Sequence, residues 1–480
     1  MEKQLYRGLL KVAVADFEGR EVNPSVYDEL RSRSADPDTL DEVYSALHTL
    51  LRAALKLPSS VLKQEAFRED LDALRIPPEF AGDLVSVVFG SSDLSRVLEP
   101  AIQMEMETSD GEVHTFEFKN CTILRNHELI VEDLWVRNNV IVNPEPIFFD
   151  ERVTADIQLD CNGAIIAPGY IDLQINGGMG VDFSHSVDTI VEAVQKVAKG
   201  VLPFGVTSMC PTIVTSTPDV YRKSTLRVNK QHLIAMLGIM CVHLEGPFIS
   251  KHKKGAHKAQ LIQDLSGGFE SLMHVYGSLD SVAIVTMAPE LDPDGKVIQA
   301  LVKKGVTVSI GHSEANLVQG EKAMQDGASF ITHLFNAMLP FHHRDPGLVG
   351  LLTSKKLPEE KNVFYGIIAD GIHTHPAALR IAYKANSRGL TLVTDAMSAM
   401  GLEAGCTSVE ALESASLHAA EVLGIQKRKG TLDFGADADF VVLDSNLHVL
   451  STWIAGECVW MKPGAQLTVI YAKPNLISRS

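Results

Sequence analysis

Apolar residues recur at helical spacing in two stretches near the N-terminus. Residues 38–57 form the first stretch, whose apolar positions are Leu40, Val43, Tyr44, Leu47, Leu50, Leu51 and Leu55. This spacing is typical of an amphipathic helix. Asp38 or Thr39 can cap its start, and Pro58 follows its end. A second helical stretch, residues 59–76, stops before two prolines. Since no catalytic side chains cluster here, the pattern predicts a small helical module that binds other proteins.

Strand-like alternation replaces the helical pattern from about residue 100. It predicts two short strands around a turn at Ser109, Asp110 and Gly111, followed by further strands. Similar β segments resume at about residues 440–460. Because the two β regions flank a long central region, we expect them to form one small β-sandwich domain.

The central region alternates apolar runs with helical stretches. Eight runs are candidate strands: 164–174, 204–212, 237–246, 281–290, 306–312, 328–333, 364–370 and 390–396. This number and spacing predict an α/β fold, a (β/α)8 TIM barrel. A doubly wound sheet is the alternative, which we disfavour because no G-x-G-x-x-G follows the first run. The expected order of domains is a helical segment with a hairpin (1–117), β-domain (118–166), barrel (167–425), β-domain (426–465) and tail (466–480).

Composition narrows the function classes. The chain has 43 basic and 60 acidic residues, a net charge of −17, which argues against nucleic-acid and anionic-membrane partners. Its six cysteines contain no C-x-x-C pair, so we expect a reducing, cytoplasmic location. We find no signal peptide and no apolar run approaching the ~20 residues of a membrane span.

Polar residues stand at the ends of most candidate strands, where barrel enzymes build active sites. A single histidine or aspartate there is more often structural, so the prediction depends on the joint pattern. Glu245, His312 and His333 are suited to bind one metal ion with an open position for water, as in catalytic zinc sites. Asp395 would be the general base and then the acid toward the leaving amine, and a nearby His257 could help carry the oxyanion charge.

Three further polar residues could hold a phosphate: Asn336, Arg344 and His373. A guanidinium fork suits that anion. For Arg344, an ion pair with Asp345 or a plain surface position remains open.

A family resemblance covers residues 118–462. It is carried by APGYIDLQINGG, GVTSMCPT, HLEGPF, KGAH, GHSEA, THLFNAM, RDPGLVG, IADGIHTHP, LVTDA and KGTLDFGADADFVVLD. In these segments the chain resembles the N-acetylglucosamine-6-phosphate deacetylases of the amidohydrolase superfamily. The resemblance implies hydrolysis of N-acetyl-D-glucosamine 6-phosphate to D-glucosamine 6-phosphate and acetate, with Glu245, His312 and His333 as metal ligands and Asp395 as acid/base. It also implies substrate contacts at Ala256, His257, Asn336, Ala337, Arg344 and His373.

The resemblance further implies a homodimer, in which Arg344 reaches the neighbouring phosphate site. Many amidohydrolases carry His-x-His at the end of the first strand and bind a second metal there. This chain has Gln174 and Asn176 instead. Amides are poor zinc ligands, so we expect one divalent metal ion per subunit, Zn²⁺.

Two departures from the family shape the alternatives. After Gly401 the chain lacks the expected hairpin, Leu-Ser-Gly-Ser loop and helix, which should leave apolar barrel surface uncovered and open the site to water. Residues 1–117 resemble part of a COMM-domain-containing protein, which implies COMM-type protein partners. One alternative is therefore a catalytically impaired fusion or adaptor. Another is a dihydropyrimidinase-like amidohydrolase, which the absent His-x-His and the absent candidate lysine at a strand end disfavour.

Overall fold

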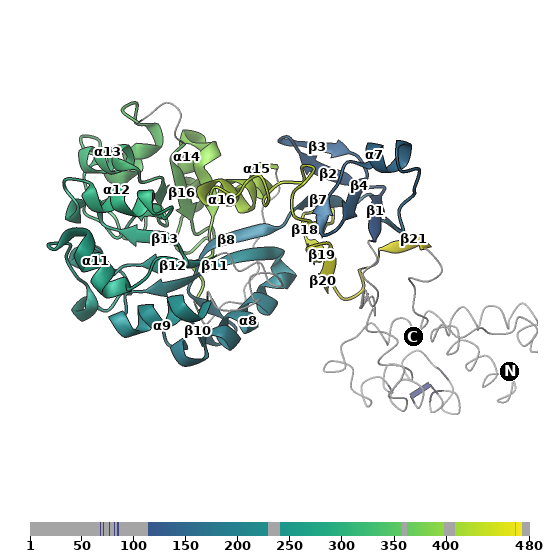
Figure 1. Cartoon of the computed structure of the whole chain (residues 1–480), viewed down its shortest axis with the longest axis horizontal. Coiled ribbons are helices and arrows are strands. Elements are labelled where there is room, and N and C mark those ends of the chain that lie inside the picture. Colours follow the sequence, from purple (N-terminus) through teal and green to yellow (C-terminus); the bar gives the residue numbers. More distant parts are fainter. Residues whose placement is uncertain are drawn as a thin grey trace, which may run out of the picture. The chain divides into compact units, whose positions relative to one another are not determined.

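The computed structural model describes residues 114–228, 241–357, 362–397, 409–465 and 467–472, with a few isolated residues between 68 and 85 (Figure 1). The helix predicted at 38–57 and the hairpin turn at 109–111 lie outside the described residues. In the second predicted helical stretch, Arg68 and Leu71 are described and both are helical.

Eight parallel strands form a nearly closed barrel, which confirms the predicted fold class (Figure 1). Neighbours in the sheet follow chain order, and β-branched and other apolar residues dominate the strands, as buried parallel strands require. The strands are β8 (Tyr170–Ile175), β11 (Val206–Val214), β12 (Val242–Glu245), β13 (Val282–Met287), β14 (Thr307–Ile310), β15 (Phe330–Ile331), β16 (Phe364–Ile367) and β17 (Leu390–Leu392).

Backbone hydrogen bonds between the first and last strand regions bring the barrel to closure. The Asp395 N–H donates to the Gln174 carbonyl at 2.8 Å, and the Asn176 N–H donates to the Ala396 carbonyl at 2.8 Å. Ile175 and Ala396 also form a parallel bridge. We call this contact between the end of β8 and residues 394–396 the seam. Because Asp395 lies in it, the last residues of the barrel are fixed by the first strand.

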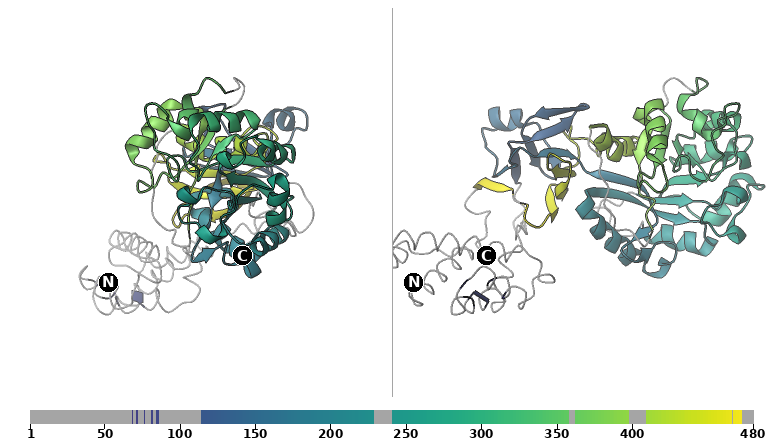
Figure 2. Two further views of the ribbon diagram at one scale, coloured as in Figure 1. Left: turned by 90° about the vertical axis from the view of Figure 1, so that its left-hand side faces the viewer. Right: turned by 180° about the vertical axis from the view of Figure 1, so that it is seen from behind.

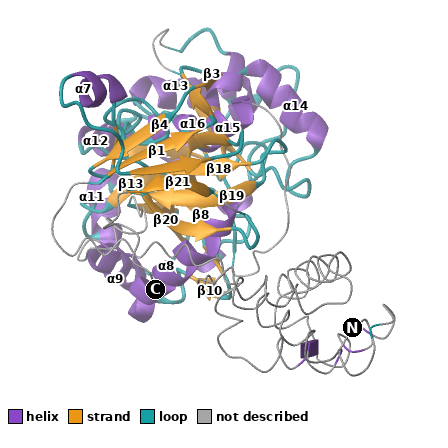
Figure 3. Ribbon diagram, turned by 90° about the vertical axis from the view of Figure 1, so that its right-hand side faces the viewer, coloured by secondary structure: helices purple, strands orange, loops and turns teal. Residues whose placement is uncertain are grey.

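Helices lie outside the barrel strands (Figure 1); Figure 3 colours all helices purple and all strands, those of the small β-domain included, orange. The α-helices outside the small domain are α8 (Ile190–Val201), α9 (Pro218–Val228), α11 (Gly268–Tyr276), α12 (Lys296–Lys303), α13 (Leu317–Asp326), α14 (Pro376–Ala385), α15 (Val409–Ala415) and α16 (Leu417–Val422). Local sequence explains their ends: Asn316 and Gln319 form a capping box at the start of α13, and Pro376 is the first residue of α14. Short 3₁₀ helices are η1 (Val187–Thr189), η2 (Leu202–Phe204), η3 (Lys251–Lys253), η4 (Ala259–Leu261), η5 (Pro289–Leu291), η6 (Gly347–Thr353) and η7 (Ser387–Gly389).

Two sheets from both sides of the barrel sequence form the small β-domain. The five-stranded sheet contains β1 (Thr115–Lys119), β4 (Leu134–Arg137), β5 (Val140–Ile141), β6 (Ile157–Asp160) and β21 (Thr468–Ala472). The six-stranded sheet contains β2 (Thr122–Arg125), β3 (Glu128–Val131), β7 (Ile165–Pro168), β18 (Phe440–Leu443), β19 (Val449–Ile454) and β20 (Glu457–Met461). Phe118 of the first sheet packs edge-on against Phe440 and Trp453 of the second, at ring distances of 5.1 and 5.0 Å.

Three details differ from the expected strands. The run 164–174 is divided, because β7 joins the six-stranded sheet and β8 joins the barrel. Residues 144–149, inside the expected β-domain (118–166), form the helix α7 (Pro144–Phe149), where Asn143 accepts the Glu145 N–H as its cap. β21 lies in residues 466–480, which we treated as a tail. β9 (Gly177–Gly178) and β10 (Val181–Asp182) form a small hairpin beyond β8.

The region after β17 contacts the barrel. α15 and α16 contact β8 and β17, and the apolar residues Leu173, Ile175 and Val393 are at most 5% exposed. Ile381 on α14, in contrast, is 64% exposed. The expectation that the shortened region leaves apolar barrel surface uncovered and opens the site to water stays a prediction. α16 lies at the N-terminal end of the barrel, since the Thr307 hydroxyl donates to the Val422 carbonyl.

The view from behind in Figure 2 shows the same strands with helices outside them. None of the helices described in the structure is long and apolar enough to cross a membrane.

Candidate metal centre and active site

The candidate residues lie at the C-terminal ends of the barrel strands. Glu245 ends β12, His312 and His333 follow β14 and β15 by two residues, and Asp395 follows β17. Parallel strands in a closed barrel bring these ends to one face. His312, His333 and Asp395 all have positive φ, at 48°, 27° and 47°. Such backbone costs about 1–3 kcal/mol each and persists only where the surroundings fix it, which is typical of functional sites.

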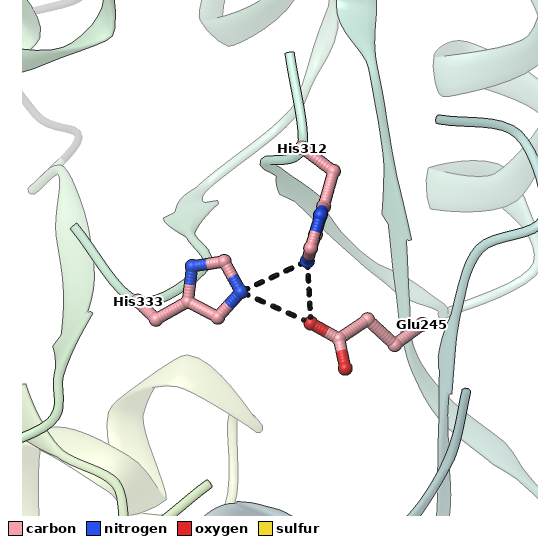
Figure 4. Close-up of side chains that lie close together, drawn as sticks. All are labelled: Glu245, His312 and His333. Carbon is pink, nitrogen blue, oxygen red and sulfur yellow. Dashed lines mark hydrogen bonds and ion pairs between the residues drawn. The ribbon is translucent and has the colours of Figure 1, made fainter. Parts of the chain in front are cut away.

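Glu245, His312 and His333 converge on one point (Figure 4). The Nε2 atoms of the two imidazoles are 3.0 Å apart, and each lies 3.2 Å from Glu245 Oε1. All three residues are at most 4% exposed. Two buried imidazole nitrogens that face one carboxylate oxygen form a donor set that a borderline divalent cation prefers. His312 Nδ1 contacts the Lys253 carbonyl at 2.8 Å, an outer hydrogen bond that orients the ring.

The charge state of Glu245 suits a ligand. Burial alone would raise the pKa of its carboxyl, but hydrogen bonds to the two imidazoles hold that pKa well below its usual range. Glu245 is therefore an anion at neutral pH. His333 Nδ1 and the side-chain oxygens of Gln174 and Asn176 are buried and make no hydrogen bond to any residue that the structure describes. The site thus keeps polar atoms that a ligand or water can satisfy.

Asp395 is linked to the metal-ligand cluster by an amide. Gln174 Nε2 donates to Glu245 Oε1 at 2.9 Å and to Asp395 Oδ1 at 3.1 Å. Asn176 Nδ2 donates to the same Asp395 oxygen at 2.7 Å. Burial, together with the nearby Glu245, raises the pKa of the Asp395 carboxyl to about 6. A carboxyl with that pKa can both accept and release a proton near neutral pH.

His257 lies beside the same cluster. Its ring centroid is 4.4 Å from that of His312, and its Nε2 is 4.0 Å from Glu245 Oε2. Burial lowers the pKa of His257 to about 4, so the imidazole is neutral at pH 7. The Thr215 N–H donates to His257 Nδ1 at 3.2 Å. Because Nδ1 accepts, the ring proton lies on Nε2, where it is available to a developing negative charge.

The candidate substrate residues lie at more open positions around this face. Ala256 and Arg344 are exposed, while Asn336 and Ala337 are half-buried in the segment after β15. His373 is exposed, and its Nδ1 is 2.6 Å from Asp370 Oδ2. Asp345 was the ion-pair partner considered for Arg344. Its carboxylate instead accepts the N–H groups of Leu317 and Gly347.

Sequence reasoning missed two sets of contacts in this site. It treated Gln174 and Asn176 only as poor metal ligands, whereas they hydrogen-bond Asp395. The signal for these hydrogen bonds was their position: they end the first strand, which neighbours the eighth strand and Asp395 in a closed barrel. It also did not single out Thr215, which follows β11 directly.

Comparisons with known proteins agree with this architecture. The amidohydrolase family matches residues 165–459. N-acetylglucosamine-6-phosphate deacetylase from Danio rerio is 52% identical over 392 residues, covering 72% of this chain and 97% of that relative. The Homo sapiens deacetylase of the same name is 49% identical over 408 residues, 76% of this chain and 100% of that relative.

Solved structures lead to the same group. N-acetylglucosamine-6-phosphate deacetylase from Pasteurella multocida is 26% identical, with a TM-score of 0.60 over 72% of this chain and 99% of that one. The family match, the sequence identity and the fold thus agree. The chain therefore belongs to the amidohydrolase family and, within it, to the family of the N-acetylglucosamine-6-phosphate deacetylases.

Proposed function

We propose that this chain hydrolyses N-acetyl-D-glucosamine 6-phosphate to D-glucosamine 6-phosphate and acetate. One observation carries the proposal: three buried ligand atoms converge within 4.8 Å of one another, and the Gln174 amide connects them to Asp395. The deacetylase relatives are about 50% identical to this chain, and nearly their whole length aligns with it. An amide-hydrolysing site on that fold therefore has the residues it requires.

The donor set fits a divalent cation, for which we propose Zn²⁺ held by Glu245, His312 and His333. One carboxylate and two imidazoles suit zinc. Because all three residues are buried, they would shield a bound ion from solvent. A bound ion supplies Lewis acidity, which makes water more acidic and polarises the scissile carbonyl. We propose one ion per subunit, since the end of β8 offers amides rather than imidazoles.

The chain's own residues account for proton movement. Asp395 accepts a proton from the attacking water and then delivers it to the nitrogen of the leaving amine. Asn176 and Gln174 hold Asp395 Oδ1, which leaves Oδ2 for that transfer. His257 donates from Nε2 to the oxygen on which negative charge develops. Its Nδ1 is already occupied by Thr215, so the ring cannot take the opposite tautomer without losing that contact.

Substrate recognition is proposed for Ala256, His257, Asn336, Ala337, Arg344 and His373. Arg344 supplies a fork suited to phosphate, and we propose that it serves the neighbouring subunit of a homodimer. A cytoplasmic location agrees with the scattered, unpaired cysteines among the described residues.

The matches to deacetylases support the enzyme rather than the adaptor or a dihydropyrimidinase-like activity. COMM-type partners for residues 1–117 stay a prediction, because that segment lies almost entirely outside the described residues.

Acetate release from N-acetyl-D-glucosamine 6-phosphate by the full chain tests the proposal. We expect turnover that is lost on chelation and restored by Zn²⁺. N-acetylglucosamine without the phosphate, at equal concentration, is the matched substrate control and should turn over much more slowly. A folded, metal-loaded chain that releases no acetate would overturn the proposal.

A further inference from the structure

Asp395 sits in a strained backbone conformation that its neighbours must maintain. Its φ of 47° is a left-handed value, unfavourable for a residue with a side chain. The residues on both sides are anchored to β8: the Ala396 carbonyl accepts the Asn176 N–H at 2.8 Å, and Thr394 contacts Asp172. These contacts hold the residues before and after Asp395 in place, while the Gln174 and Asn176 amides hold its carboxylate.

Two hydrogen bonds, one of them short, join Thr394 to Asp172. The Thr394 hydroxyl donates to Asp172 Oδ2 at 2.6 Å, and the Thr394 N–H donates to Asp172 Oδ1 at 3.3 Å. The same hydroxyl oxygen accepts the Ala396 N–H at 3.2 Å. The hydroxyl of Thr394, the residue before Asp395, thus connects the residue after Asp395 to the first barrel strand. A hydrogen bond to a carboxylate is stronger than one between neutral groups.

Asp172 is buried where a carboxylate is costly. It is 4% exposed, and burial raises its pKa to about 6. Besides the two groups of Thr394, it accepts the Gln174 N–H at 3.1 Å. An apolar or neutral side chain would fill this place at lower cost. The carboxylate is the group that can accept the hydroxyl and both N–H groups together.

We infer that Asp172 and Thr394 are positioning residues for Asp395, acting as a clamp across the seam that fixes the direction of its carboxylate. The inference rests on the acid/base role proposed for Asp395 above. Neither residue is among the candidate metal ligands, so the clamp should affect the chemical step more than substrate or metal binding. A displacement of about 1 Å at a reacting group can slow a reaction 10²-fold.

Thr394→Val tests the clamp, since it removes the hydroxyl while keeping the branched shape. The side chain is exposed, so the fold should tolerate the change. We expect kcat for acetate release to fall at least tenfold, with KM and bound zinc within twofold of the unchanged chain. Thr394→Ser, which restores the hydroxyl, should recover most of the rate. The double variant Thr394→Val with Asp172→Asn should be no slower than the slower single variant.

Controls separate this inference from the proposed function. Thr307→Val removes a comparable hydroxyl hydrogen bond at the other end of a barrel strand and should leave kcat unchanged. A Thr394→Val chain with unaltered kcat overturns the clamp, as does a loss that Thr394→Ser does not recover. If Asp395→Asn is inactive while Thr394→Val is normal, only the clamp is wrong. If Asp395→Asn keeps its turnover, the role of Asp395 is wrong and the clamp with it.

Discussion

Replacement of Gln174 by Met would disconnect the metal-ligand cluster from Asp395. The side chain is fully buried, and its amide donates to Glu245 at 2.9 Å and to Asp395 at 3.1 Å. Methionine has a similar length but cannot donate. Each hydrogen bond to a charged group contributes about 1.5–3 kcal/mol, so the pair sums to about 3–6 kcal/mol. Part of that sum would appear as lower stability, which makes it an upper bound for any single measured effect.

We expect the rest of this free-energy loss to appear mainly as weaker zinc binding. Outer partners of metal ligands typically change affinity 10- to 100-fold, and we expect the zinc affinity of Gln174→Met to fall by that factor. The effect on kcat at saturating zinc should be smaller, less than about tenfold, because the Asn176 amide still holds Asp395 at 2.7 Å.

Zinc affinity would be measured by competition with a chromogenic chelator, and kcat by acetate release at saturating zinc. Gln158→Met is the matched control: it removes an amide that donates to Glu117 at 2.7 Å in the small β-domain, far from the proposed chemistry. An unchanged zinc affinity in Gln174→Met, alongside an unchanged control, would refute the coupling between the amide and the ligand cluster.

Four further predictions follow from other parts of the structure. Asp395→Asn should retain zinc while kcat falls about 10²- to 10⁴-fold, the range for general acid–base groups; wild-type turnover would contradict its role. Because the base must be ionised and the pKa of Asp395 is about 6, kcat/KM should fall as the pH drops below 6, and a flat profile from pH 5 to 8 would argue against it. Arg344→Ala should weaken phosphorylated substrate far more than its unphosphorylated analogue, whereas the exposed Arg380→Ala should affect neither; equal losses on both substrates would reject a phosphate contact. Phe118→Ala should lower the free energy of unfolding by about 3–5 kcal/mol in denaturant titrations, since this fully buried ring lies between the two sheets, and a loss below about 1 kcal/mol would show that the sheets do not depend on it.

The sequence was sufficient for the barrel and for the convergence of its ligands. Eight apolar runs with polar ends predict parallel strands, and closure alone brings Glu245, His312 and His333 to one face. Their mutual distances of 3.0–3.2 Å depend in addition on side-chain conformation, which the topology does not fix.

Contacts that depend on closure geometry and side-chain conformation were beyond sequence reasoning. The Gln174 and Asn176 amides were identified at the right strand end, but their hydrogen bonds to Asp395 depend on how β8 meets residues 394–396. The apolar pattern likewise could not separate β7 from β8, because only Gly169 stands between the two strands. Only the pairing of each half with different neighbours distinguishes them.

The passage from β7 to β8 has a mechanical consequence. A single glycine, Gly169, separates a strand of the six-stranded sheet from the first strand of the barrel, and its N–H donates to the Asp439 carbonyl. A Cβ at this glycine would lie 2.1 Å from the Thr207 hydroxyl oxygen. A side chain at this position would clash with Thr207, so the passage from the sheet into the barrel requires a glycine. The first barrel strand begins one residue after a strand of the β-domain ends, and this connection leaves little chain length for one to shift independently of the other.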